Sequence, residues 1–226
     1  MRVYKFLNAK WGLKALEDRR LKIARISDLN DPFELLGTDL SNQELRTAFV
    51  EMKNALDKNH GLLCFSKRWR NPVLWSHYSD GHRGLCLGFD VPDELLMGVT
   101  YSGKRTTSEK LFSKDQSVRE REMNRLLSTK FSHWRYENEV RCFVSLEDED
   151  PHNGFYFLEF SNEIKIRRFL LVPKRAFRVA MLKRLLGAKM LKSSGSRCEQ
   201  LSRHSTLCGT GGNLCGSSSY IPLWRR

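Results

Sequence analysis

Residues 62–90 read LLCFSKRWRNPVLWSHYSDGHRGLCLGFD, and this stretch decides the fold. It predicts two strands, residues 61–66 and 84–90, on either side of a short helix. Asn71 is the expected cap of that helix, Pro72 its first residue and Tyr78 its end. A second stretch, residues 133–143, reads HWRYENEVRCF and predicts the opening of a strand over residues 137–146. Because polar groups on strand ends commonly form small-molecule sites, these two stretches direct the search for function.

The pattern on either side is a mixture of strands and helices that do not alternate strictly. Further strands are predicted at residues 2–7, 21–25, 98–102, 154–160 and 164–172. Helices are predicted from Asn8 to about residue 19, after a capping box at residues 41–44, and over residues 108–131 and 174–191. No glycine motif of the dinucleotide-binding or P-loop type is present. We therefore expect an α+β fold, with an irregular mixed or antiparallel sheet and flanking helices.

The composition predicts one domain and a tail. The 226 residues are expected to form a single domain over residues 1–192, followed by a disordered tail over residues 193–226 that is rich in serine and glycine. No apolar run approaches the ~18–20 residues of a membrane helix, and the N-terminus has no apolar signal segment. We expect a cytoplasmic protein without a membrane partner. Cys64, Cys86 and Cys142 fall in apolar runs and are expected to be reduced core residues, and no metal site is expected.

The net charge of +13 is concentrated late in the chain. Residues 164–198 contain no Asp or Glu but many Lys and Arg. The basic segment 165–192 therefore attracts polyanions, and non-specific binding of nucleic acid is one possible role. A basic face that is simply solvated is the other interpretation.

Glu137 and Glu139 are the first candidates for chemistry. In an extended chain, residues two apart point to the same face, so both glutamates would share a face with Arg141. A carboxylate at a strand end can hydrogen-bond a sugar hydroxyl and stabilise an oxocarbenium ion. The alternative is a structural ion pair across the sheet. For a catalytic glutamate, Glu139→Ala is expected to leave folding nearly intact, because an exposed pair stabilises a fold by about 0–1 kcal/mol. A variant that unfolds would favour the structural interpretation.

Four further positions offer weaker signals. His77 is a candidate acid–base group because its ordinary pKa is near neutrality, although a structural histidine beside a core Trp75 and Tyr78 is the alternative. Ser66 ends a strand, where a serine can orient a carboxylate. Tyr4 and Lys5 lie on the first strand, where a ring or a cation can meet a phosphate or a nicotinamide.

Six motifs together resemble those of a large bacterial family known as a domain of unknown function. They are residues 4–6 (YKF), 30–34 (NDPFE), 64–66 (CFS), 75–78 (WSHY), 84–90 (GLCLGFD) and 134–141 (WRYENEVR). They occur in the family's order between residues 4 and 145. This resemblance by itself implies no activity.

More distantly, the chain is similar to ADP-ribosyltransferases. The shared features are a first strand with a basic or aromatic residue, a central strand that ends in serine, and a late strand that opens with E-x-E-V. The resemblance implies an ADP-ribosyltransferase-like fold and an enzyme with NAD as donor. In it Glu139 holds the nicotinamide ribose, Ser66 orients that glutamate, and Tyr4 or Lys5 contacts NAD. The first motif, residues 4–6 (YKF), has no Arg or His at the place where the superfamily has one.

The same resemblance implies that Glu137 helps to activate an acceptor, whose identity stays open. His77 and Tyr78 complete the expected NAD-contacting residues. A bacterial toxin or a phage-defence effector would carry such an activity. The alternative function is a non-catalytic nucleic-acid-associated module that uses the basic segment 165–192.

Overall fold

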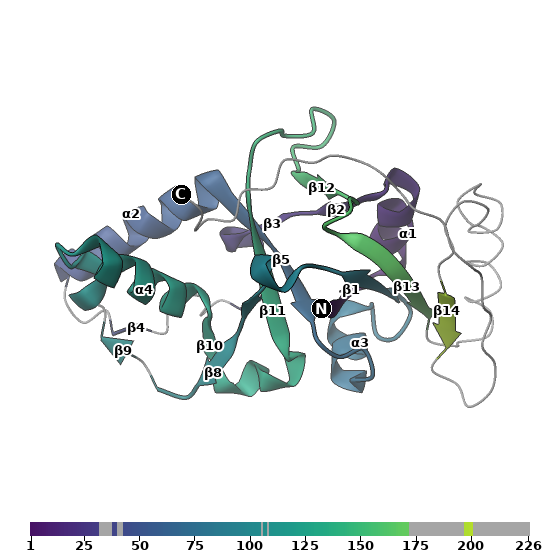
Figure 1. Ribbon diagram of the computed structural model, residues 1–226, viewed down its shortest axis with the longest axis horizontal. Coiled ribbons are helices and arrows are strands. Elements are labelled where there is room, and N and C mark those ends of the chain that lie inside the picture. Colours follow the sequence, from purple (N-terminus) through teal and green to yellow (C-terminus); the bar gives the residue numbers. More distant parts are fainter. Residues whose placement is uncertain (32–37, 40–42, 105, 108, 172–196, 201–226) are drawn as a thin grey trace. The chain divides into compact units, whose positions relative to one another are not determined.

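The computed structural model describes residues 1–31, 38–39, 43–104, 106–107, 109–171 and 197–200. The chain divides into two compact units (Figure 1). Of the described residues, the first unit contains 1–22, 64–95, 157–171 and 197–200, and the second contains 23–31, 38–39, 43–63, 96–104, 106–107 and 109–156. The single domain expected over residues 1–192 stays a prediction.

The first unit is a sheet with two helices. Its strands are β1 (Arg2–Leu7), β6 (Leu85–Asp90), β13 (Lys165–Leu171), β14 (Arg197–Gln200) and the second half of β5 (His60–Ser66), in the order β14-β13-β6-β1-β5. β6 is antiparallel to both β1 and β13, and β14 is parallel to β13. Helices α1 (Ala9–Asp18) and α3 (Pro72–Tyr78) and the 3-10 turn η2 (Asp93–Leu95) complete the unit, with the separate pair β2 (Arg20–Lys22) and β12 (Phe157–Glu159).

The core of the first unit lies around β6, which is central and apolar from Leu85 to Phe89. Leu85, Leu87 and Phe89 have no measurable exposure. Helix α1 packs closely, because a Cβ at Gly12 would lie 2.5 Å from Leu85 Cγ. Both helices begin as the sequence predicts, since Asn8 Oδ1 accepts from the backbone N–H of Trp11 and Asn71 caps α3 in the same way.

The second unit has the longer helices and, apart from β5 and β11, strands of two or three residues. Its helices are α2 (Gln43–Asn59) and α4 (Gln116–Leu127), with 3-10 turns η1 (Ile26–Asp28), η3 (Glu109–Phe112) and η4 (Ser132–Glu137). The first half of β5 is followed in sheet order by β11 (Glu139–Ser145) and β7 (Met97–Gly98), and β3 (Ala24–Arg25) also pairs with β5. Two parallel pairs are separate: β8 (Thr100–Ser102) with β10 (Thr129–Phe131), and β4 (Thr38–Asp39) with β9 (Thr106–Thr107).

These elements confirm the α+β class, with helices and an open, mainly antiparallel sheet. Several predicted boundaries are wrong. The helix expected over residues 108–131 is η3, then α4, then β10, because Asp115 caps a new helix and residues 129–131 pair with β8. The strands expected at 21–25 and 98–102 are each split in two, and only Phe157–Glu159 of the strand expected at 154–160 forms.

Two predicted segments lie mostly outside the described residues. These are the basic helix over residues 174–191 and the tail over residues 193–226, within which only β14 is described. Residues 32–34 of the NDPFE turn are also outside. None of the helices in the described ranges is both long and apolar enough to cross a membrane.

Candidate functional site

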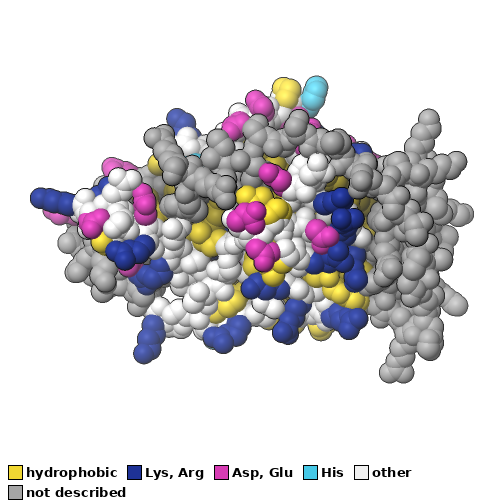
Figure 2. Space-filling model, in the orientation of Figure 1, with side chains coloured by type: hydrophobic (Ala, Val, Ile, Leu, Met, Phe, Trp, Pro, Cys, Tyr) yellow, Lys and Arg dark blue, Asp and Glu magenta, His cyan; other side chains and the backbone are white. Residues whose placement is uncertain are grey.

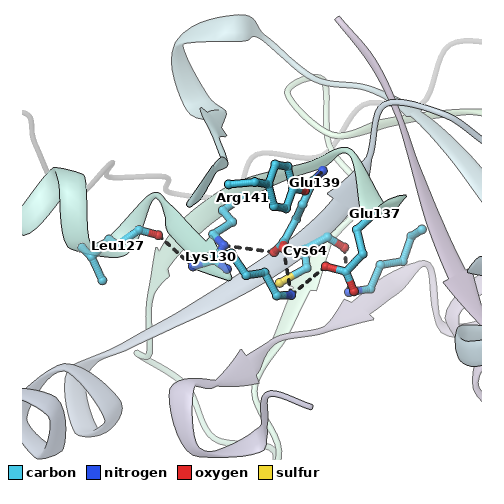
Figure 3. A network of polar contacts seen from close by, with 8 residues as sticks. Cys64, Leu127, Lys130, Glu137, Glu139 and Arg141 are labelled. Carbon is cyan, nitrogen blue, oxygen red and sulfur yellow. Dashed lines mark hydrogen bonds and ion pairs between the residues drawn. The ribbon is translucent and has the colours of Figure 1, made fainter. Parts of the chain in front are cut away.

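The candidate site of the second unit is built on one continuous segment, β10–η4–β11. Asn138 ends η4 with left-handed backbone angles (φ 47°, ψ 51°), and its N–H bonds to Arg135 O. Asn adopts this conformation more readily than most residues. The turn brings Glu137, from the end of η4, and Glu139, from the start of β11, to the same lysine of β10 (Figure 3).

Four charged side chains form this buried ion cluster. Lys130 Nζ lies 2.6 Å from Glu137 Oε2 and 3.1 Å from Glu139 Oε2. Arg141 Nε lies 3.0 Å from Glu139 Oε1, and Arg141 Nη1 donates to the Leu127 carbonyl at 2.7 Å. All four side chains are at most 7% exposed. Two cations balance two anions here, as buried charge requires.

Two aromatic residues, Tyr101 and Trp134, contact the cluster. The backbone N–H of Glu139 donates to the Tyr101 hydroxyl at 2.8 Å. Burial raises the pKa of Tyr101 to about 12, and the charges of Glu139 and Glu137 act in the same direction. The Lys130 ammonium lies 4.9 Å from the Trp134 ring centroid, within cation–π range.

The geometry corrects the sequence interpretation of the two glutamates. Glu137 belongs to a 3-10 turn and not to the strand, so the glutamates converge through the turn at Asn138 and not through strand alternation. Both faces of β11 are buried, including Glu139 at 4% exposure and Arg141 at 1%. The premise that Glu139 is an exposed carboxylate is therefore wrong, because its side chain is buried and pairs with both Lys130 and Arg141. We now expect Glu139→Ala to destabilise the fold.

The sequence did not indicate Lys130 or Tyr101. Lys130 fell within a predicted helix with a charged outer face. A lysine on such a face is ordinary and does not indicate a buried or functional residue. The pattern Thr129-Lys130-Phe131 is too short to predict a strand by itself. Its pairing partner, β8, is equally short.

The first unit holds the other predicted residues. Tyr4 on β1 is the register partner of Ser66 on β5, and both side chains are buried. Lys5 Nζ donates to the Cys64 carbonyl at 3.0 Å. The Ser66 hydroxyl donates to Arg68 O and accepts from Arg68 N–H, so it closes the turn after the strand.

The α3 residues have mixed environments. Trp75 is 1% exposed, meets Phe6 edge-on with ring centroids 5.2 Å apart, and donates to Trp69 O. It is a core residue. His77 is exposed and Tyr78 half-buried, with their ring centroids 6.2 Å apart. Trp75 therefore anchors the helix, while His77 is open to solvent.

Basic side chains gather over β13 in Figure 2. Lys165, Arg167 and Arg168 belong to this strand. Asp90 accepts from both Arg2 and Arg167. The rest of the basic segment 165–192 lies outside the described residues. Among the residues that the structure describes, no three His, Cys, Asp or Glu side chains are grouped to hold a metal ion.

Comparison with known families gives one match. Residues 74–142 match the family described as "Protein of unknown function (DUF2971)". This stretch runs from α3 into β11 and includes Lys130, Glu137 and Glu139. The match supports a relationship to a domain-of-unknown-function family. No curated protein and no solved structure matches the chain.

Proposed function

We propose that the chain is an ADP-ribosyltransferase-like enzyme that uses NAD as donor. The observation that carries the proposal is the meeting of Glu137 and Glu139 on Lys130 at the opening of β11. Glu139 is the position to which the resemblance assigns the ribose-holding glutamate. The ion cluster supplies what such a residue needs, a carboxylate with a fixed orientation.

The fixed carboxylate suits the charge that develops during the reaction. Cleavage of the bond between the ribose and nicotinamide sends the electron pair to nicotinamide, which leaves neutral, and a positive charge develops on the ribose. A preorganised carboxylate in a water-poor setting stabilises that charge more than a mobile one does. The acceptor then forms the new bond to the ribose, and Glu137 takes the acceptor's proton.

The proposed reaction requires Glu139 to become accessible to the ribose. Glu139 Oε1 faces Arg141 and Oε2 faces Lys130, and the side chain is 4% exposed. A ribose hydroxyl can reach this carboxylate only when one of those two contacts opens. Lys130 belongs to β10, and Glu139 and Arg141 belong to β11, so we assign the opening to a rotation of one of these three side chains.

Tyr4, Lys5 and Ser66 are proposed NAD contacts of the first unit. Their strands are adjacent, with Tyr4 directly opposite Ser66. This pairing supports the proposal, because the resemblance assigns NAD contact to the first strand and an orienting role to the serine strand. His77, exposed on α3, is a further proposed contact with Tyr78.

The test is the release of nicotinamide from NAD by purified protein, together with calorimetric binding of NAD. Glu139→Gln keeps the shape of the side chain and removes its charge, and we expect it to lower nicotinamide release by about 10²–10³-fold. Glu137→Gln should impair transfer to an acceptor more than simple hydrolysis. Glu147→Gln, an exposed glutamate of the same unit, is the matched control and should have no effect.

Thermal melts of each variant separate lost chemistry from lost structure. A folded Glu139→Gln variant with unchanged nicotinamide release would show that Glu139 is a structural member of the ion cluster. Wild-type protein that neither binds NAD nor releases nicotinamide would contradict the proposal as a whole.

A further inference from the structure

A short basic loop joins β5 to α3 in the first unit (Figure 1). Residues 67–70 read KRWR, so three cations surround one tryptophan. The side chains of Lys67, Arg68 and Arg70 are exposed, and Trp69 is half-buried. The loop therefore presents positive charge and part of an aromatic ring to solvent.

The positive charges of this loop are not neutralised by the protein. No Asp or Glu occurs in the sequence between residues 57 and 80. Within the part of the chain that the structure describes, none of the three loop cations belongs to an ion pair. Cations so close together repel one another, and an anionic partner would offset that repulsion.

Hydrogen bonds from both neighbouring elements fix the backbone of the loop. The Ser66 hydroxyl, at the end of β5, donates to Arg68 O at 3.0 Å and accepts from the Arg68 N–H at 3.1 Å. From α3, the indole N–H of the buried Trp75 donates to Trp69 O at 2.7 Å. Because the loop is held at these points before any partner arrives, little backbone entropy is lost on binding.

Trp69 and Arg70 form a cation–π pair. The Arg70 guanidinium carbon lies 4.8 Å from the Trp69 ring centroid. Unpaired bases stack on tryptophan rings and on arginine guanidinium planes, and both groups are present here. Phosphate groups accept hydrogen bonds from Lys and Arg. The four residues thus combine the two kinds of contact that a single-stranded nucleic acid makes with protein.

The helix that follows the loop argues against a duplex as the partner. A protein that reads duplex DNA commonly places a helix in the major groove. Helix α3 has only seven residues, and two of them, Leu74 and Trp75, are buried in the core. Bases inside a duplex are also stacked on one another and closed to a tryptophan ring. The loop therefore fits a single strand better than a duplex.

We propose that the loop formed by residues 67–70 binds single-stranded nucleic acid. Lys67 and Arg68 contact phosphates, and the pair of Trp69 and Arg70 stacks against a base. This surface is separate in the sequence from the basic segment 165–192. Binding here does not depend on NAD transfer, because none of the four loop residues is a proposed NAD contact.

Labelled oligothymidylate of about 12 nucleotides is the probe, because single-strand sites span ~4–16 nucleotides. Fluorescence anisotropy with the full chain should show tighter binding of this strand than of three comparison ligands. These are its duplex with oligoadenylate, an abasic strand of equal length, and polyglutamate. The abasic strand tests stacking without any change to the protein. Oligouridylate, measured in parallel, shows whether DNA or RNA binds better, and tight binding of either supports the proposal.

Variants of the loop assign the contacts. Trp69→Leu removes the ring and should weaken binding by about ten-fold, whereas Trp69→Phe should keep most of the affinity. Arg68→Gln removes one phosphate contact, so the slope of log affinity against log salt concentration should become shallower by about 0.7. Lys10→Gln is the matched control, because Lys10 is also exposed and lies 5.5 Å from the Trp11 ring centroid, but on α1. Thermal melts check that each variant is folded.

Each alternative result contradicts the proposal in a different way. Equal affinity for the abasic strand would show that the loop stacks on no base. Equal affinity for the duplex would overturn the choice of a single strand, and equal affinity for polyglutamate would favour an acidic protein. An equal loss in Lys10→Gln would show attraction to net charge and no defined site. A chain that binds oligothymidylate as described but releases no nicotinamide would contradict only the proposed transferase.

Discussion

Lys130 and Glu139 form an ion pair 3.1 Å long between side chains that are 5% and 4% exposed. At the surface such a pair would contribute little, but here each partner has lost nearly all of its water. The attraction then has to offset a desolvation cost of several kcal/mol for each ion. Removal of one partner leaves the other charged and buried.

Glu139→Ala should therefore destabilise the protein by about 3–5 kcal/mol, the range for breaking a buried pair. Glu122→Ala is the control, because Glu122 pairs at 2.6 Å with Arg125 and these side chains, at 16% and 41% exposed, are both more exposed than those of the cluster. That loss should be about 0–1 kcal/mol. Urea unfolding of both variants measures the difference. A Glu139→Ala variant as stable as Glu122→Ala would mean that the buried cluster contributes nothing net.

Tyr101 should lose its proton only at high pH, and the free energy of unfolding should therefore depend on pH in that range. Burial raises its pKa to about 12 from an ordinary value of 10.0. The folded state therefore holds this proton more tightly than the unfolded state, so the associated stability is complete below pH 10 and is lost as the pH rises toward 12. Absorbance titration should show one of the six tyrosines ionising near pH 12, and Tyr101→Phe should remove that phase. A titration in which all tyrosines ionise near pH 10 before unfolding contradicts the burial of Tyr101.

The main elements of the fold follow from local sequence signals. The strands at residues 2–7 and 84–90 and the capped helices after Asn8 and Asn71 are present with nearly the predicted bounds. Apolar runs and helix caps depend only on residues that are close together in the chain, so they can be recognised in the sequence itself. The helix predicted over residues 108–131 failed because residues 129–131 pair with β8, a contact made almost thirty residues away. Long-range pairing of three-residue strands has no local signature.

The sequence predicted the two glutamates of the candidate site but not the residues that they contact. Glu137 and Glu139 stand out because two acids are two apart at a strand opening. Their meeting on Lys130 depends on the left-handed backbone at Asn138, which spacing alone does not indicate. Burial of Arg141 was not predicted either, because an arginine in a strand ordinarily faces water.

Gly84 should tolerate no side chain. A Cβ there would lie 2.1 Å from the Leu7 carbonyl oxygen, which belongs to the backbone and cannot rotate away. Gly84→Ala should therefore destabilise by about 1–3 kcal/mol through overpacking. Gly98→Ala is the control, because nothing lies within 4 Å of a Cβ at that position, and it should change stability by about 0.5 kcal/mol or less. Chemical denaturation decides the comparison, and equal effects would contradict the close approach of Leu7.

Asp90 should contribute to acid sensitivity of the first unit. Its carboxylate accepts from Arg2 Nε at 2.7 Å and from Arg167 Nε at 3.0 Å. The hydrogen bond from Arg2, with further help from the charges of Arg2 and Arg167, holds the pKa of Asp90 below its ordinary value of 3.8. The stability from this depressed pKa is present above pH 3.8 and is lost as the pH falls through the folded-state value.

Asp90→Asn should therefore lower stability at pH 6 and make less difference at pH 2.5. The effect should be about 0–1 kcal/mol, because the Asp90 side chain is 37% exposed and solvent screens the pairs. Asp80→Asn is the control, since Asp80 contacts only the exposed Arg83 among the ion pairs seen in the described chain. Guanidinium chloride would screen these pairs, so urea unfolding at the two pH values is the measurement. If wild type and Asp90→Asn differ equally at both pH values, Asp90 acts through shape and not through its charge.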